Sequence, residues 1–248
     1  VLENSILTNN IAFNGGAVYG NTNGDVNVVN SEFIGNVASV NGSSIYAESA
    51  LTVKESIFNS ESVNGNATIF IKSSNKDNIT LVNNTITGNS LAIYNDGGNL
   101  ISQTHLIFDN ATGTIGRNIA LKATFTDDKG NIIGSNTPVL GNVHNTNVTF
   151  VFDEKTKKFI GTYKEVQAEG NYTISGNYSY ATDAIVTNGT LNIRPLHSFN
   201  DLQQWINKTT SGDTLLLDAN EFFAKSNDTT VNINKNITID GQGAIIDA

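Results

Sequence analysis

A short pattern returns along the first 110 residues and limits what this chain can fold into. In it, an apolar residue is followed three positions later by Asn, and only the third of five copies lacks the Asn. The apolar members follow one another at steps of 26, 25, 28 and 21 residues. They are Leu7, Phe33, Phe58, Ile86 and Ile107. Self-similarity at such a period indicates a solenoid or another repeat array.

We call the equivalent residues of successive copies a column, so the apolar residues above form the first column. Two further columns recur with nearly the same spacing. One places an aromatic residue after a β-branched residue, and the other consists of alternating apolar residues. Their members are Val18-Tyr19, Ile45-Tyr46, Ile69-Phe70 and Ile93-Tyr94, and then Val26/Val28, Leu51/Val53, Ile79/Leu81 and Leu100. The short apolar runs predict strands, and the Asn, Gly and Ser between them predict corners. We therefore expect an all-β chain that begins as a right-handed parallel β-helix, with a β-sandwich as the alternative.

Successive rungs of a β-helix place equivalent residues over one another, so each column predicts a ladder of like side chains. One ladder is of amides and the other is of aromatic rings, which we expect to point into the coil because β-branched residues flank them. The predicted ladder residues are Asn10, Asn36, Asn89 and Asn110, and Tyr19, Tyr46, Phe70 and Tyr94.

Two motifs carry a resemblance to a known repeat. Gly15-Gly16-Ala17-Val18 and Phe33-Ile34-Gly35-Asn36 are similar to the GGA(I/L/V) and FxxN motifs of the polymorphic outer-membrane-protein repeat. The Asn-rich, Cys-free style resembles the adhesin-like surface proteins of methanogenic archaea, in which that repeat also occurs. The third coil departs from the pattern, since Asn64-Gly65-Asn66-Ala67-Thr68 replaces the glycine pair. The resemblance implies an extracellular, cell-surface protein with a β-helix and Ig-like modules.

After Asn110 the pattern changes to longer alternating strands. Residues 118–126 alternate apolar and polar side chains, and similar segments follow at 147–153, 158–165, 170–178 and 187–193. Short alternating strands at this spacing favour a β-sandwich. The order also resembles the Ig-like modules of the adhesin-like proteins. Thr112–Gly116 is rich in small residues and is predicted to be a hinge.

The last segment predicts a helix followed by a second β-helix. Pro195 keeps Arg194 extended and marks a boundary. Residues 198–207 have an apolar face and two possible N-caps, Ser198 and Asn200. The strands that follow resemble the cap and opening coils of a pectate-lyase-like β-helix. The predicted domains are 1–116 (β-helix), 117–194 (Ig-like sandwich) and 195–248 (capping helix and opening coils).

The composition limits the classes of binding partner that the chain can have. The chain of 248 residues has a net charge of −9 and a pI near 4.7, which argues against nucleic acid and against docking on an anionic membrane. No apolar run of membrane-spanning length occurs. Val1 begins within a coil and Ala248 ends on another, so we expect a piece of a longer chain, or a subunit. In either case the Ala248 end is expected to stack head to tail on the Val1 end of the next unit.

Catalysis is not expected. Polysaccharide-cleaving β-helices need converging carboxylates, whereas the acidic residues of the first 110 positions fall on different phases and no Arg accompanies them. Asp240 and Asp247 fit turn chemistry. We therefore expect a non-catalytic structural or adhesive protein without a cofactor. The alternative is a carbohydrate-binding or polysaccharide-degrading β-helix that uses the column tyrosines as stacking platforms for host-cell or matrix glycans.

Metal sites are not expected either. His105, His144 and His197 lie in separate segments without the spacing of a metal site. Asp127-Asp128 and Asp153-Glu154 offer oxygen ligands for Ca²⁺, with unliganded turns as the preferred interpretation.

Asn-x-Ser/Thr sequons are frequent, which follows in part from the 38 Asn residues. As a set they favour a surface protein that is N-glycosylated. Asn110 also begins a sequon but is expected to be tied into the amide ladder. The predicted glycosylation sites are Asn41, Asn66, Asn78, Asn83, Asn147, Asn171, Asn177, Asn188, Asn207, Asn227 and Asn236.

Overall fold

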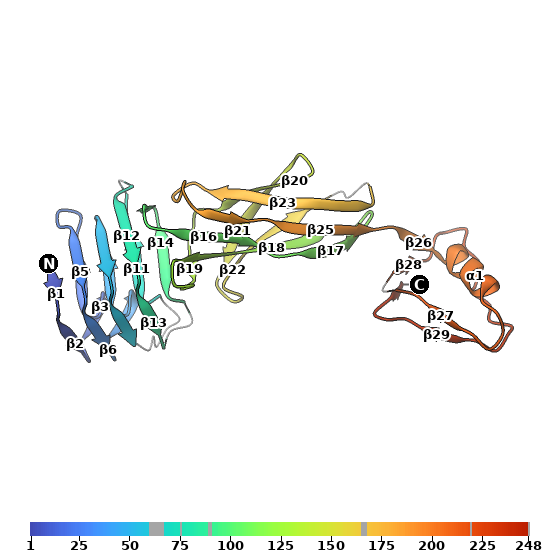
Figure 1. Ribbon diagram of the computed structural model, residues 1–248, viewed down its shortest axis with the longest axis horizontal. Coiled ribbons are helices and arrows are strands. Elements are labelled where there is room, and N and C mark those ends of the chain that lie inside the picture. The colour runs from blue at the N-terminus through green and yellow to red at the C-terminus, as the bar shows by residue number, and fades with distance from the viewer. Residues whose placement is uncertain (60–66, 75, 89–90, 165–167, 219, 248) are drawn as a thin grey trace. The chain divides into compact units, whose positions relative to one another are not determined.

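The structure is a computed structural model that describes residues 1–59, 67–74, 76–88, 91–164, 168–218 and 220–247 (Figure 1). These residues form short β-strands and corners, and their single helix is α1 (Phe199–Lys208). The chain divides into two compact units. The first comprises Val1–Asn110, Ala120–Thr162 and Thr173–Gly189, and the second comprises Ala111–Ile119, Tyr163–Tyr172 and Thr190–Ala248.

The first unit begins as a β-solenoid, as predicted. Its strands pair in parallel with the equivalent strands one rung away, and they form four sheets along the stack (Figure 1). One sheet contains β1 (Leu2–Glu3), β5 (Val26–Val29), β9 (Leu51–Lys54), β12 (Asn78–Val82) and β15 (Asn99–Leu100). The next contains β2 (Ile6–Thr8), β6 (Glu32–Ile34), β10 (Ile57–Asn59) and β13 (Thr85–Thr87). The others are β4 (Val18–Gly20), β8 (Ile45–Ala47), β11 (Ile69–Lys72), β14 (Ile93–Asp96) and β19 (Ile133–Gly134), and the pair β3 (Ile11–Asn14) and β7 (Val37–Asn41).

The register confirms that the repeat columns keep phase. Phe33 lies between Leu7 and Phe58, and Phe58 in turn pairs with Ile86. The rings of Phe33 and Phe58 are fully buried and stack with centroids 4.6 Å apart. Burial of side chains of this size stabilises the fold by about 1.5–3 kcal/mol each. The apolar column is therefore the core of the rungs.

Each rung turns between its first and second sheets through a left-handed residue. Asn4, Asn30, Glu55 and Asn83 occupy this corner with φ between 44° and 56°. Asn adopts positive φ more readily than most residues, because its short polar side chain bonds to nearby backbone. The Asn-rich composition thus has a local cause at this corner.

The predicted stacking of Ile107 on the fourth rung is wrong, whereas the predicted stacking of Leu100 on Ile79 is confirmed. Ile107 lies in β16 (Thr104–Phe108), which pairs antiparallel with β18 (Ile119–Asp127) instead of stacking on the fourth rung. The solenoid edge is covered by other backbone: Ile93 pairs with Ile133, and the Leu100 amide donates to the Tyr180 carbonyl at 2.7 Å. One end of the solenoid is therefore closed within the first unit.

The longer strands of the first unit lie in one mixed sheet. Their order is β23 (Gly170–Tyr178), β20 (Val139–Val143), β21 (Thr146–Asp153), β22 (Lys158–Tyr163), β18, β16 and β24 (Ile185–Thr187). The predicted alternation along residues 118–126 is confirmed, since Leu121, Ala123 and Phe125 are buried and the intervening side chains are more exposed. The Ig-like assignment stays a prediction, as do the domain limits at 116 and 194.

The second unit contains the predicted helix and the start of a second set of parallel rungs. The rungs consist of β26 (Leu196–Ser198), β28 (Glu221–Phe223) and β30 (Ile245–Asp247), and of β27 (Thr214–Leu216) and β29 (Thr238–Asp240). In α1, Leu202 and Ile206 are buried against Leu217 and Phe222. The helix therefore covers the apolar interior of these rungs. The predicted hinge at Thr112–Gly116 lies largely in a strand, because β17 (Ala111–Thr114) pairs with β25 (Gly189–Arg194).

Candidate functional site

The four predicted aromatic residues form one continuous column across the first unit. Tyr19, Tyr46, Phe70 and Tyr94 stack with successive centroid distances of 5.3, 5.6 and 5.0 Å and interplanar angles of 8°, 12° and 17°. Strand pairing causes the stack, because equivalent residues of parallel strands lie opposite one another. The aromatic ladder is thus present as predicted.

The predicted inward direction of these rings is wrong. Ile71 faces the coil interior, because a Cβ built on Gly98 would meet the side chains of both Ile71 and Ile79. Successive strand residues point to opposite faces, so Phe70 points away from the interior. The same holds at Tyr19, since the neighbouring Gly20 faces Val26. The aromatic column therefore lies on the outer face of its sheet.

The stacking decides what the rings can bind. Each ring between two others has both faces covered, and Tyr46 is 4% exposed. Tyr19 has a ring on one side only and is 53% exposed. A sugar stacks on the face of an aromatic ring, so the column offers Tyr19 alone for that contact.

Hydrogen bonds and burial keep the hydroxyl groups of Tyr46 and Tyr94 protonated. The Tyr46 hydroxyl donates to Glu48 at 3.2 Å, and the Tyr94 hydroxyl donates to Asn136 at 2.5 Å. Burial, followed by the charge of Glu48, raises the pKa of Tyr46 to about 12. Burial and the charge of Asp96 also raise the pKa of Tyr94 to about 12. These hydroxyls are structural donors at neutral pH.

The amide ladder is present in part. Asn10 donates from its side chain to the Asn36 side-chain oxygen at 2.8 Å, and Asn36 donates to the Leu7 carbonyl at 2.9 Å. Asn89 lies outside the described residues. Asn110 is exposed, and the strand before it pairs antiparallel with β18. The place of Asn110 in the ladder stays a prediction.

A second polar ladder was not predicted from the sequence. The backbone amides of Ser5, Ser31 and Ser56 donate to the side-chain oxygens of Ser31, Ser56 and Asn84, respectively, at 3.0–3.2 Å. Ser31, Ser56 and Asn84 are nearly fully buried. The available signal was a Ser or Asn two positions before each of the first four members of the apolar column. Asn131 closes this ladder by donating to the Asn84 carbonyl.

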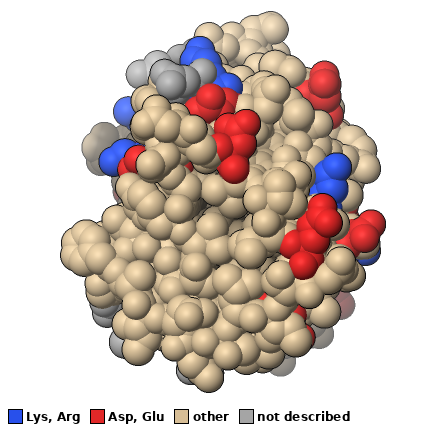
Figure 2. Space-filling model, turned by 90° about the vertical axis from the view of Figure 1, so that its left-hand side faces the viewer, with Lys and Arg blue, Asp and Glu red and all other residues tan. Residues whose placement is uncertain are grey.

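The first rung leaves its outer edge open. β1, β2, β3 and β4 all stand at the ends of their sheets. Ile11 and Phe13 of this rung are 81% and 69% exposed, and Ile6 and Tyr19 are also exposed. Figure 2 looks onto this end and shows that most of the face carries no charged side chain. The open rung, defined as residues 2–20, is an apolar edge whose strands are paired on one side only.

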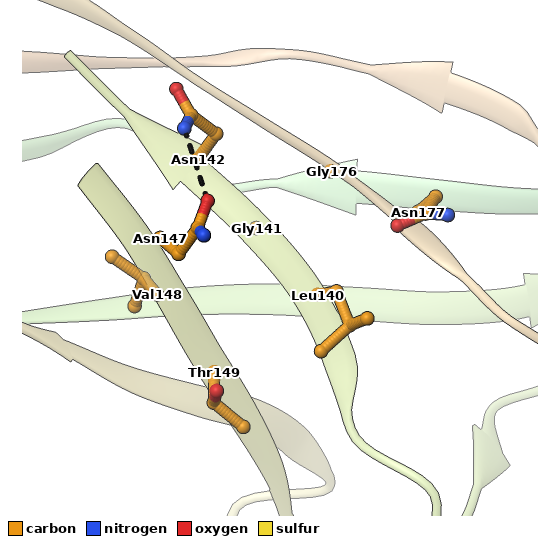
Figure 3. Close-up of a pocket in the computed structure, with 8 residues that line it drawn as sticks. All are labelled: Leu140, Gly141, Asn142, Asn147, Val148, Thr149, Gly176 and Asn177. Carbon is orange, nitrogen blue, oxygen red and sulfur yellow. Dashed lines mark hydrogen bonds between the residues drawn. The ribbon is translucent and has the colours of Figure 1, made fainter. Parts of the chain in front are cut away.

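A second surface feature lies on the mixed sheet. It is a groove of about 450 Å³ (Figure 3). Figure 3 shows the Asn142 and Asn147 amides on one side of it and Leu140, Thr149 and Asn177 on the other. Of the described residues that line it, none is charged. Neither the repeat nor any motif indicated this groove.

Most predicted glycosylation sites are exposed, but nothing in the structure tests whether they carry sugar. Asn41 is half-buried, and Asn66 lies outside the described residues. The exposed ones are Asn78, Asn83, Asn147, Asn171, Asn177, Asn188, Asn207, Asn227 and Asn236.

The acidic turn at Asp127 is built from backbone contacts. Its carboxylate accepts hydrogen bonds from the amides of Lys129 and Asn131 and from the Asn131 side chain, at 2.8–3.0 Å. Burial raises the pKa of Asp127 despite these donors. The turn's donors thus use three of the roughly four lone pairs of this carboxylate. Throughout the described part of the chain, no three His, Cys, Asp or Glu side chains are grouped to hold a metal ion.

The remaining ionisable candidates lie in separate settings. His105 is in β16, His144 is in the turn before β21, and His197 stacks on Phe222 and contacts Trp205 edge-on. Asp247 lies 3.6 Å from Arg117. These residues are not brought together into a site.

Comparisons with known proteins add no family: no family model matches the chain, and no curated protein matches it. Over the described residues, the structure has no helix with the length and apolarity that crossing a bilayer requires. The fold defines the chain as a β-solenoid protein. Its two candidate functional surfaces are the open rung and the neutral groove.

Proposed function

We propose that this chain is a non-catalytic structural or adhesive element of a cell surface, whose units stack end to end into a fibre or stalk. The open rung is the observation that supports this most directly. Exposed strand edges with an apolar cross-section pair readily with other strands, and proteins normally cover them. Here the opposite solenoid edge is covered by β19 and Tyr180, whereas the open rung is not.

The other end of the chain offers a matching surface. β29 and β30 end their sheets, and Ile239, Ile245 and Ile246 are exposed there. A head-to-tail contact between two different edges generates a fibre when the rotation between successive copies does not close into a ring. The partner is a second copy of the chain, or the continuation of the same polypeptide.

The experiment is electron microscopy with sedimentation of the 248-residue chain at high concentration. Fibres or concentration-dependent growth are expected, and Ile11→Lys is expected to abolish them because it places a charge on the open rung. The matched control is Val151→Lys, which changes an exposed apolar strand residue away from the open rung. A chain that stays monomeric at high concentration contradicts stacking between separate copies of this chain.

The surface location and glycosylation are part of the same proposal. They rest on the resemblance to adhesin-like surface proteins of methanogenic archaea and on the many exposed sequons. Intact-mass measurement of native material tests the glycosylation, and a mass equal to that of the bare chain contradicts it for that source.

Saccharide binding is the second candidate function. The tyrosine platforms expected from the sequence do not support it, because the inner rings cover one another. The neutral groove on the mixed sheet supports it instead.

A further inference from the structure

The groove lies between two rows of outward-facing side chains that cross β21, β20 and β23. In one row, Leu140 stands opposite Thr149 and Asn177. In the other, Asn142 stands opposite Asn147. Residues two apart on a strand point to the same face, so both rows project from one side of the sheet.

The floor of the groove is formed by the row between these two. Gly141 pairs there with Val148 and Gly176, and all three residues line the groove. Their side-chain positions face the opposite side of the sheet: Val148 is buried, and a Cβ on Gly141 would meet the Phe150 ring. The ligand side of the floor is therefore backbone, and no side chain fills the space above it.

The walls combine amides with one apolar side chain. Asn142 donates to Asn147 at 3.4 Å, which uses one of two amide hydrogens and one of two lone pairs. Both amides thus keep a donor and an acceptor for a ligand, and Asn177 presents a third amide. Leu140 is 48% exposed beside them. Adjacent sugar hydroxyls each donate and accept, and the C–H face of a sugar ring is apolar, so this lining matches an uncharged saccharide.

We infer that the groove formed by Leu140, Asn142, Asn147, Thr149 and Asn177 is a binding site for a neutral saccharide. The absence of charged groups among its described lining residues disfavours sugar acids, sulfated glycans and cationic ligands. The site is separate from the open rung, so it acts on a single chain and does not depend on end-to-end stacking. With Asn147 and Asn177 unmodified, it would give the surface element a ligand of its own, because a glycan on either side chain would occupy the groove.

The test uses the whole chain, produced in a bacterium so that Asn147 and Asn177 carry no sugar. ¹⁵N-labelled protein is titrated with neutral tetrasaccharides of glucose, mannose, galactose and N-acetylglucosamine, and with a uronic-acid tetrasaccharide. Shifts of the Asn142, Asn147 and Asn177 side-chain amides are expected with at least one neutral sugar. The dissociation constant is expected on the order of 1 mM, because an open groove contacts one side of the ligand.

Variants separate this site from any other. Asn142→Ala and Asn177→Ala are each expected to weaken binding about 3- to 10-fold, the effect of one lost hydrogen bond. Thr149→Val keeps the branched shape of the side chain and replaces only the hydroxyl with a methyl group, so it gives a second measurement if an Ala variant is poorly folded. The matched control is Asn59→Ala, an exposed strand amide outside the groove, which should leave the affinity unchanged.

Several outcomes would overturn the inference. These are no shift with any neutral sugar at millimolar concentration, a preference for the uronic-acid ligand, or shifts that map away from the groove. Equal affinities for the wild type and all groove variants would also overturn it. None of these results bears on fibre formation, which is measured separately.

Discussion

Tyr19 and Tyr46 stack with their ring centroids 5.3 Å apart and their planes 8° apart, yet Tyr46 is almost inaccessible and Tyr19 is more than half exposed. The two rings occupy the same position of successive rungs. Tyr46 has a neighbour on each face, whereas Tyr19 belongs to the open rung and has one. The exposure of a residue in a solenoid thus depends on whether a rung lies on each side of it as well as on the residue type.

The inward and outward sides of a rung can be separated by a pair of variants. Phe58→Ala is expected to lower the free energy of unfolding by about 3–5 kcal/mol, because it leaves a cavity at a fully buried site. The adjacent Ile57 is 50% exposed, so Ile57→Ala should cost about 1 kcal/mol or less. Urea denaturation followed by circular dichroism measures both. Equal losses would mean that the two side chains do not face opposite sides.

The amide ladder is expected to matter more inside the stack than at its end. Asn36→Ala removes an acceptor for the Asn10 backbone and side chain and a donor to Leu7, at a fully buried position. We expect a loss of about 2–4 kcal/mol in the free energy of unfolding. Asn10→Ala, at the open rung, should cost about 1 kcal/mol or less. The same denaturation measurement decides, and a larger loss for Asn10→Ala would contradict the ladder.

Alkaline pH should lower the free energy of unfolding, because ionisation of buried tyrosine hydroxyls is less favourable in the folded chain. Burial raises the pKa values of Tyr46, Tyr94 and Tyr178 to about 12, from about 10 in the unfolded chain. Because the folded-state values are the higher ones, the stabilisation is complete below pH 10 and is lost as the pH rises towards 12. Ultraviolet titration at 295 nm should show that a fraction of the tyrosine hydroxyls ionises only towards pH 12. In urea, which unfolds the chain, the same hydroxyls should ionise at lower pH. A folded-state titration that is complete by about pH 11 would contradict this.

The helix cap gives a local test. Ser198 accepts from the Asp201 amide and Asp201 accepts from the Ser198 amide, so Ser198→Ala should cost about 1 kcal/mol. Asn200→Ala is the control, because Asn200 does not cap the helix. Hydrogen bonds from Ser198 lower the pKa of Asp201, so the cap's contribution is present above the carboxyl's ordinary value and lost as the pH falls through the lowered one. Fluorescence of Trp205, the single Trp, reports both effects.

Much of the fold could be predicted from the spacing of apolar residues along the sequence. The apolar column at Phe33 and Phe58 predicted the rungs, because a solenoid imposes one environment on each repeated position. The capping helix was equally readable, and the structure selects Ser198 over Asn200 as its cap. The rungs and the helix were both predictable because the apolar residues that pack together recur at a nearly regular spacing along the chain.

Other features depended on which elements meet. The strand containing Ile107 carries the same local motif as a rung, but it pairs antiparallel with β18. The motif does not predict which strand it pairs with. The Ser31–Ser56 ladder and the groove at Leu140 were also missed, since each arises where backbone from distant segments comes together.

The amino-acid pattern alone determined that equivalent residues of the first four repeats stack over one another, because the columns keep the same phase although the repeat length varies between 25 and 28 residues. Only the tertiary structure decided the direction of the aromatic column. Ile45, Tyr46 and Ala47 are all apolar in character and all buried, so their alternation does not distinguish the two faces of the strand. The outer face is recognised only when the interior is seen to be filled by the other residues of each rung.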